Sequence, residues 1–168
     1  RIAELLHLKE LLKELNVNCV FDVGANRGQF ATELRSIGYR EHIVSFEPNP
    51  TEFEILGKKF EHDQKWKGFA VALGDQERVE KFIVPKRRTD LSSFLTSVKD
   101  AGDVRYLDTE IKRLDAIFHV STEHIPAPRA FLKMDTQGFD VNVFKGAEGC
   151  MGNIVGLDVD YKSLPKSN

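Results

Sequence analysis

Residues 19–31 read CVFDVGANRGQFA and are the most informative segment of the sequence. A short apolar run predicts a buried strand, which ends at Asp22, and the turn after it holds Gly24, Asn26 and Gly28. Apolar residues at helical spacing follow at once and predict an amphipathic helix. Glycines let a ligand approach the backbone closely, and the helix N-terminus offers unpaired N–H groups. The stretch therefore predicts the unit with which α/β proteins hold nucleotide-like ligands.

The composition is typical of one globular domain. The chain has 168 residues, of which 41% are apolar and 30% are charged, so we expect residues 1–168 to form a single domain that opens with a helix over residues 1–16. A net charge of −2 argues against nucleic acid or an anionic membrane as a partner. No apolar run approaches the ~18 residues of a membrane span. Cys19 and Cys150 do not suggest a disulfide framework, and we predict a cytoplasmic protein.

Apolar runs alternate with amphipathic helical patterns along the chain. After the first strand, strands are predicted at residues 42–46, 66–73, 130–134 and 154–159. Residues 79–84 predict an antiparallel strand, residues 104–111 a further strand, residues 114–118 a short helix, and residues 86–103 a long mobile loop. The alternation predicts an α/β, Rossmann-like fold, in which helices cover both faces of a mostly parallel sheet.

Three carboxylates follow predicted parallel strands, namely Asp22, Glu47 and Asp135. Ligands of such sheets lie beyond the carboxyl ends of the strands, so we expect these acids at one site. Glu47 comes 19 residues after Gly28, close to the spacing of an acid that binds ribose hydroxyls. Each acid could also serve as an ordinary helix cap or a solvated strand end.

The turn narrows the choice of ligand. The dinucleotide fingerprint requires a second glycine for the pyrophosphate, and Asn26 stands in its place. The phosphate-binding P-loop is also absent from the sequence. A ligand with adenosine but no phosphates fits better, and S-adenosylmethionine is such a ligand. An NAD-dependent oxidoreductase and a binding module without catalysis remain the alternatives.

Several segments resemble the FkbM-type S-adenosylmethionine-dependent methyltransferases, in the order in which that family carries them. The similar segments are residues 22–28 (DVGANRG), 46–50 (FEPNP), 70–75 (AVALGD), 113–115 (RLD) and 132–147 (LKMDTQGFDVNVFKGA). Asp140 stands where glutamate is commoner in the family. The resemblance implies a class I methyltransferase fold and methylation of a hydroxyl on a small acceptor, such as a sugar or another natural product.

The resemblance also implies roles for individual residues. Asp22 and the loop to Gly28 would hold the methionine end, Glu47 the ribose, and an apolar wall the adenine. The residues expected to contact the cofactor are Asp22, Gly24, Ala25, Asn26, Gly28, Phe46, Glu47, Pro48, Ala72, Leu73 and Asp135. Asp135 is also the candidate catalytic residue, which would orient the acceptor hydroxyl or take its proton. The alternative for Asp135 is an acid that only ties its strand to the next loop.

Other candidates carry weaker signals. His119 and His124 could act as a base, but histidines on loops are usually solvated, and their spacing fits no metal site. The basic run at residues 86–88 predicts a solvated loop, and residues 92–95 could cover the acceptor. The resemblance implies two strands beyond residues 154–159, and the few residues that follow cannot supply them. We therefore expect a truncated C-terminal end and an open sheet edge that favours pairing with a second copy.

Overall fold

The computed structural model describes residues 2–85, 92 and 103–159. In this part of the chain five parallel strands form the central sheet, in the order β3-β2-β1-β7-β8. The strands are β1 (Cys19–Val23), β2 (His42–Phe46), β3 (Trp66–Phe69), β7 (Ala130–Met134) and β8 (Ile154–Val159). The order reverses between β1 and β7, so the switch point of this α/β sheet lies where these two strands meet. The predicted Rossmann-like fold is confirmed.

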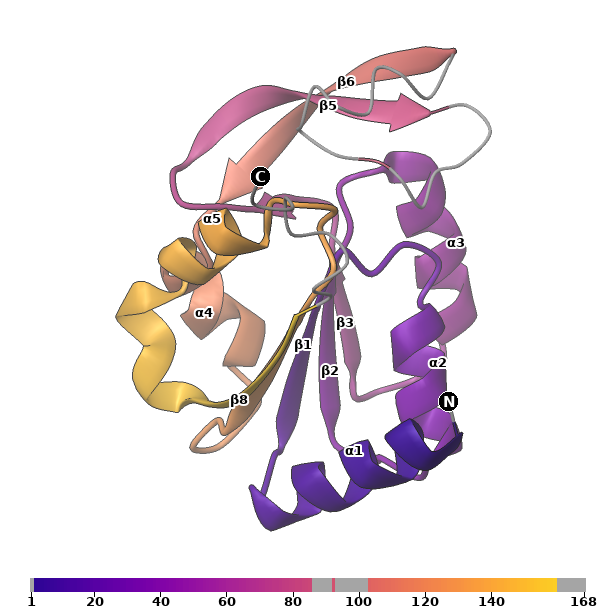
Figure 1. The fold of residues 1–168 in the computed structure, drawn as a ribbon, viewed down its shortest axis with the longest axis vertical. Coiled ribbons are helices and arrows are strands. Elements are labelled where there is room, and N and C mark those ends of the chain that lie inside the picture. Colours follow the sequence, from indigo (N-terminus) through magenta and orange to yellow (C-terminus); the bar gives the residue numbers. More distant parts are fainter. Residues whose placement is uncertain (1, 86–91, 93–102, 160–168) are drawn as a thin grey trace, which may run out of the picture.

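Helices cover both faces of this sheet (Figure 1). The first face carries α1 (Ile2–Glu14), α2 (Gln29–Ser36) and α3 (Pro50–Phe60). The second carries α4 (Leu114–Thr122), α5 (Asp140–Gly146) and the 3-10 helix η3 (Glu148–Asn153). Successive residues of β1 belong to two different hydrophobic cores, because successive side chains of a strand point to opposite faces of the sheet. Val20 packs with Leu34 and Leu56 on the first face, and Phe21 packs with Leu114 and Val143 on the second.

A second, smaller sheet lies at the carboxyl ends of the parallel strands and has the order β4-β6-β5 (Figure 1). It consists of β4 (Ala72–Leu73), β5 (Arg78–Pro85) and β6 (Val104–Lys112). The antiparallel pairing predicted for residues 79–84 is confirmed, because β5 runs antiparallel to β6 along its whole length.

The single strand predicted for residues 66–73 is wrong. It is two strands, with β3 in the large sheet and β4 in the small one. The reason is that β2 pairs with β3 only as far as Phe46 and Phe69, and Pro48, soon after, has no N–H to donate. Beyond that point the chain leaves the sheet, and Ala72 pairs with Ile111 of β6 instead.

Strand β8 lies at the edge of the large sheet, and in the described residues no strand pairs with its outer side. Both cysteines are buried free thiols. In the described part of the chain no helix is long and apolar enough to cross a membrane. The predicted mobile loop lies outside the described residues except for Ser92 and Asp103, and the basic run at residues 86–88 lies entirely outside them.

Candidate functional site

A cavity of about 780 Å³ opens at the carboxyl ends of the parallel strands and continues along β7 and β8 to α1. Nine of the eleven predicted cofactor residues line it, namely Gly24, Ala25, Asn26, Phe46, Glu47, Pro48, Ala72, Leu73 and Asp135. Asp22 and Gly28 do not line it. The structure therefore brings together residues from three strand ends and from the start of the second sheet.

The turn after β1 is fixed by close packing against neighbouring elements. Gly24 has a φ of +76°, and a Cβ at this position would lie 2.1 Å from the carbonyl oxygen of Asp135. Gly28 has a φ of +77°, and a Cβ there would meet Leu56 and Phe60 of α3 at 2.7 Å. Gly24 therefore lets β1 and β7 approach each other at the cavity, whereas Gly28 serves the packing of α3 against the turn.

Glu47 lies directly after β2, and its residue is only 5% exposed. Its two carboxylate oxygens accept hydrogen bonds from the backbone N–H groups of Asn26 and Asn49, each at 2.8 Å. Burial raises the pKa of Glu47 to about 7, against the lowering effect of these two hydrogen bonds. A carboxylate has about four acceptor sites, so Glu47 keeps acceptor capacity for a ligand in the cavity.

An apolar wall forms one side of the cavity near Glu47. Ala72 and Leu73 of β4 are buried there, and Val71 joins them. Phe46 stacks on Phe69, with ring centroids 5.4 Å apart and an interplanar angle of 15°. A wall without hydrogen-bonding groups next to a carboxylate suits the flat, apolar face of a base beside a ribose.

Asp22 is fully buried in β1 and pairs with Lys133 of β7, its register partner, at 2.9 Å. The second carboxylate oxygen, Oδ2, has no hydrogen-bond partner among the described residues. Burial acts to lower the pKa of Lys133, but Asp22, Asp135 and Asp158 outweigh it, so the pKa is raised and the ammonium stays charged. Lys133 itself lines the cavity, whereas Asp22, its partner, does not.

Asp135 is half-buried at the end of β7 and lines the cavity. One of its oxygens, Oδ1, accepts a hydrogen bond of 3.0 Å from the side chain of Gln137, whose φ is +53°. The next acid, Asp140, binds the backbone N–H and the hydroxyl of Thr136 at 2.9 and 2.6 Å. The loop after β7 is thus held by its own side chains.

Other residues from the similar segments act in packing. Arg113 binds Asp115 through two hydrogen bonds of 2.9 and 2.5 Å and donates a third, of 2.7 Å, to the carbonyl of Asp75. Asp115 also accepts the N–H of Gly149 at 3.0 Å, which joins α4 to η3. A Cβ on Gly146 would lie 1.9 Å from the carbonyl oxygen of Gly74. These residues hold β4 and the helices of the second face together.

The other predicted candidates lie away from the cavity. His119 and His124 are exposed and do not line it. In the described residues no group of His, Cys, Asp or Glu side chains could hold a metal ion. Of the segment 92–95 the structure describes only Ser92, which lines the cavity.

The part of the cavity near α1 is not predicted from the sequence. Leu5, Leu8 and Leu11 of α1 line it, together with Phe30 and Lys133. The leucines recur at helical spacing, a pattern that predicts packing on the sheet and gives no signal for a ligand. Lys133 carried a signal, because a charged residue inside an apolar strand needs a buried partner.

Comparison with known families gives a match over most of the chain. The sequence matches the family described as Methyltransferase FkbM domain over residues 22–154, which include β1, the Glu47 turn and the loop after β7. The chain belongs to the FkbM methyltransferase family. No curated protein and no solved structure matches the sequence. The FkbM domain thus covers the ends of β1, β2 and β7 at the cavity, and the methyltransferase function expected from the resemblance is confirmed at this general level.

Proposed function

We propose that this FkbM domain binds S-adenosylmethionine and methylates a hydroxyl group of a small acceptor molecule. The observation that carries the proposal is the buried Glu47 carboxylate beside an apolar wall, at the carboxyl ends of the parallel strands. An acid with free acceptor sites suits the two neighbouring hydroxyls of a ribose, and the wall suits an adenine. The cytoplasmic location and a saccharide acceptor stay predictions.

The residues present fit this cofactor. Glu47 would hold the ribose, Ala72 and Leu73 would hold the adenine, and the turn from Gly24 to Asn26 would face the methionine end. Asn26 has a φ of +48°, and its N–H is already bound to Glu47, so this turn does not offer the open glycine backbone that a pyrophosphate requires. The pairing of Asp22 with Lys133 argues against direct contact between Asp22 and the cofactor ammonium.

The cofactor supplies an electrophilic methyl group, and the protein's contribution is to hold the acceptor oxygen in line with it. Asp135 is the described carboxylate at the end of β7, where it could orient that hydroxyl. A general base is less important than geometry in such a displacement, so exposed His119 and His124 are not needed.

The experiment that tests this function is turnover. The purified chain is incubated with S-adenosylmethionine and a panel of hydroxylated acceptors, and S-adenosylhomocysteine is measured. We expect release that depends on the acceptor and is lost in Asp135→Ala if Asp135 orients the hydroxyl. Release that does not change between acceptors, or none with any acceptor despite cofactor binding, would favour a binding module instead.

A further inference from the structure

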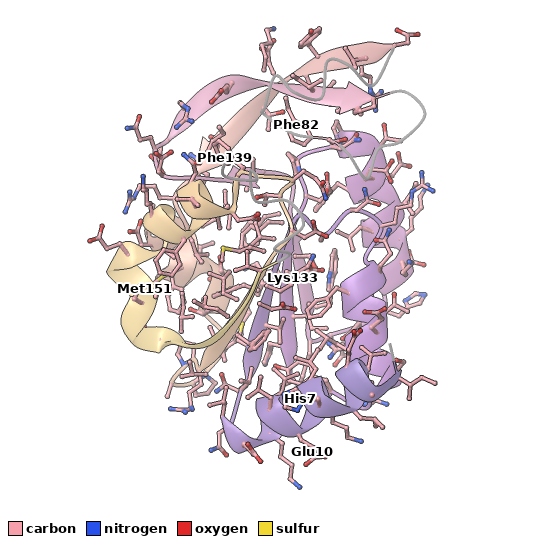
Figure 2. The ribbon with its side chains drawn as sticks, viewed as in Figure 1. His7, Glu10, Phe82, Lys133, Phe139 and Met151 are labelled. Carbon is pink, nitrogen blue, oxygen red and sulfur yellow. The ribbon has the colours of Figure 1, made fainter. Side chains whose placement is uncertain are left out.

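The cavity has a second part that the proposed cofactor contacts do not use. We call it the α1 limb, and it is lined by Leu5, Leu8 and Leu11 of α1, Phe30 of α2, and Phe131 and Lys133 of β7. It joins the cofactor part along β7, because every second residue of a strand points to the same face of the sheet. Phe131, Lys133 and, directly after the strand, Asp135 therefore all line the cavity. Figure 2 shows Lys133 between the strand ends and His7 of α1.

The α1 limb has an apolar floor and a charged rim. Leu5, Leu8 and Leu11 are half-buried, whereas Glu4 and His7 on the same helix are exposed. Phe131 is 2% exposed and belongs to the core beneath the floor. Gln29, Glu33 and Asp158 also line the cavity, but a saccharide placed on the leucine and phenylalanine side chains of the floor would leave the hydroxyl groups that face them without hydrogen-bond partners, which is unfavourable. The hydrocarbon part of a ligand would instead bury its own apolar surface and that of the floor, which is favourable.

One charged pair, Asp22 and Lys133, lies beside this floor. The ammonium of Lys133 lies 2.9 Å from Asp22 and 5.4 Å from the centre of the Phe30 ring. Asp135 lies two residues further along the chain, directly after β7, and lines the same cavity. A molecule with a hydroxyl at one end and an apolar body would therefore meet polar groups near Asp135 and apolar side chains along α1.

From this arrangement we propose that the α1 limb binds the apolar body of a hydroxylated acceptor, so that the acceptor is an alkyl or aglycone-bearing alcohol and not a free saccharide. The inference deepens the proposed function, on which it rests. A volume of about 780 Å³ for the whole cavity lies within the range of roughly 300–1,000 Å³ that ligand sites occupy, towards its upper end. It leaves space for an acceptor beside the cofactor.

The test compares two probes with the same sugar head, octyl β-D-glucoside below its micelle concentration and methyl β-D-glucoside. Each is titrated by calorimetry into the purified chain, with and without saturating S-adenosylhomocysteine. We expect the octyl probe to bind at least about tenfold more tightly, because its additional methylene groups lie on the apolar floor. Equal affinities, or no binding of the octyl probe, would overturn the inference.

A matched pair of variants on α1 assigns the binding to the limb. Leu5→Glu puts a charge on the floor, whereas Leu6→Glu puts the same charge on a neighbour that is 55% exposed and does not line the cavity. We expect Leu5→Glu to lower the affinity for the octyl probe at least about tenfold and Leu6→Glu to leave that affinity unchanged, because only the charge at position 5 is desolvated when the probe binds. Equal effects of the two variants would contradict the assignment.

Titration of S-adenosylhomocysteine separates this inference from the proposed function. If Leu5→Glu weakens the binding of S-adenosylhomocysteine and not that of the octyl probe, the limb holds the methionine end of the cofactor, and the inference is wrong. If S-adenosylhomocysteine fails to bind the unmodified chain while the octyl probe binds as expected, the proposed function fails and the apolar site stands.

Discussion

Two opposing effects act on the protonation of Glu47. Its side chain is buried, which favours the neutral acid, yet it accepts two backbone N–H groups, which favour the carboxylate. Those N–H groups belong to Asn26 of the first turn and Asn49 at the start of α3, so the residue also joins two elements. The balance leaves the pKa of Glu47 at about 7. Hydrogen bonds donated by a ligand to the carboxylate would therefore favour the ionised form of Glu47.

Replacing Glu47 by alanine should strongly weaken the binding of the cofactor. Hydrogen bonds to a charged group contribute about 1.5–3 kcal/mol each, so the Kd for S-adenosylhomocysteine should rise roughly 10- to 10,000-fold. Calorimetry measures the Kd, and circular dichroism checks that the variant is folded. Glu54→Ala on the exposed face of α3 is the matched control and should change nothing. An unchanged Kd in Glu47→Ala would show that this acid only organises the two loops.

The raised pKa of Glu47 predicts a pH dependence of binding. Ribose hydroxyls donate to the ionised form, so affinity should increase as the pH rises through about 7. The Kd at pH 6 should be about tenfold weaker than at pH 8, since the ionised fraction changes about that much across a pKa near 7. Glu47→Gln cannot titrate, so it should remove this dependence. The same slope in Glu47→Gln would assign the pH effect to another group.

At the scale of elements, the approach of β1 to β7 depends on one position. Gly24 touches the backbone of Asp135 so closely that no side chain fits, and its backbone is left-handed. Gly57 of α3 is a matched control, because a Cβ there meets nothing within 4 Å.

Gly24→Ala should therefore destabilise the fold. The backbone strain alone costs on the order of 1–3 kcal/mol, and displacement of the Asp135 carbonyl adds to it. Gly57→Ala should stabilise slightly, by roughly 0.5–1 kcal/mol, because alanine favours a helix. The midpoint of urea unfolding measures both variants. Similar midpoints in the two would contradict the close packing of the turn against β7.

The elements could be predicted from the sequence to different degrees. Strands β1, β2, β7 and β8 follow from apolar runs of the right length, and the observed strands agree with the predicted ranges for the last three. The division of residues 66–73 into β3 and β4 could not be predicted, because it depends on where β2 stops offering partners. Pairing with β6 joins residues about forty apart, and no local pattern reports it.

At the scale of the whole molecule, the strand-end acids were predictable but their contacts were not. Their positions follow from strands that run parallel, so Glu47 and Asp135 meet at one cavity as expected. Asp22 differs, because its side chain points into the first face of the sheet and pairs with Lys133. That pairing is set by the register of β1 and β7, which the sequence does not specify. The same register places the α1 limb beside Lys133.

We propose that the cavity binds S-adenosylmethionine and not a dinucleotide. The most direct measurement is calorimetric titration of the purified chain with S-adenosylhomocysteine and, in parallel, with NAD. We expect saturable one-to-one binding of S-adenosylhomocysteine and at least about a hundredfold weaker binding of NAD, because Asn26 stands where a pyrophosphate requires a glycine. Tighter binding of NAD would contradict it.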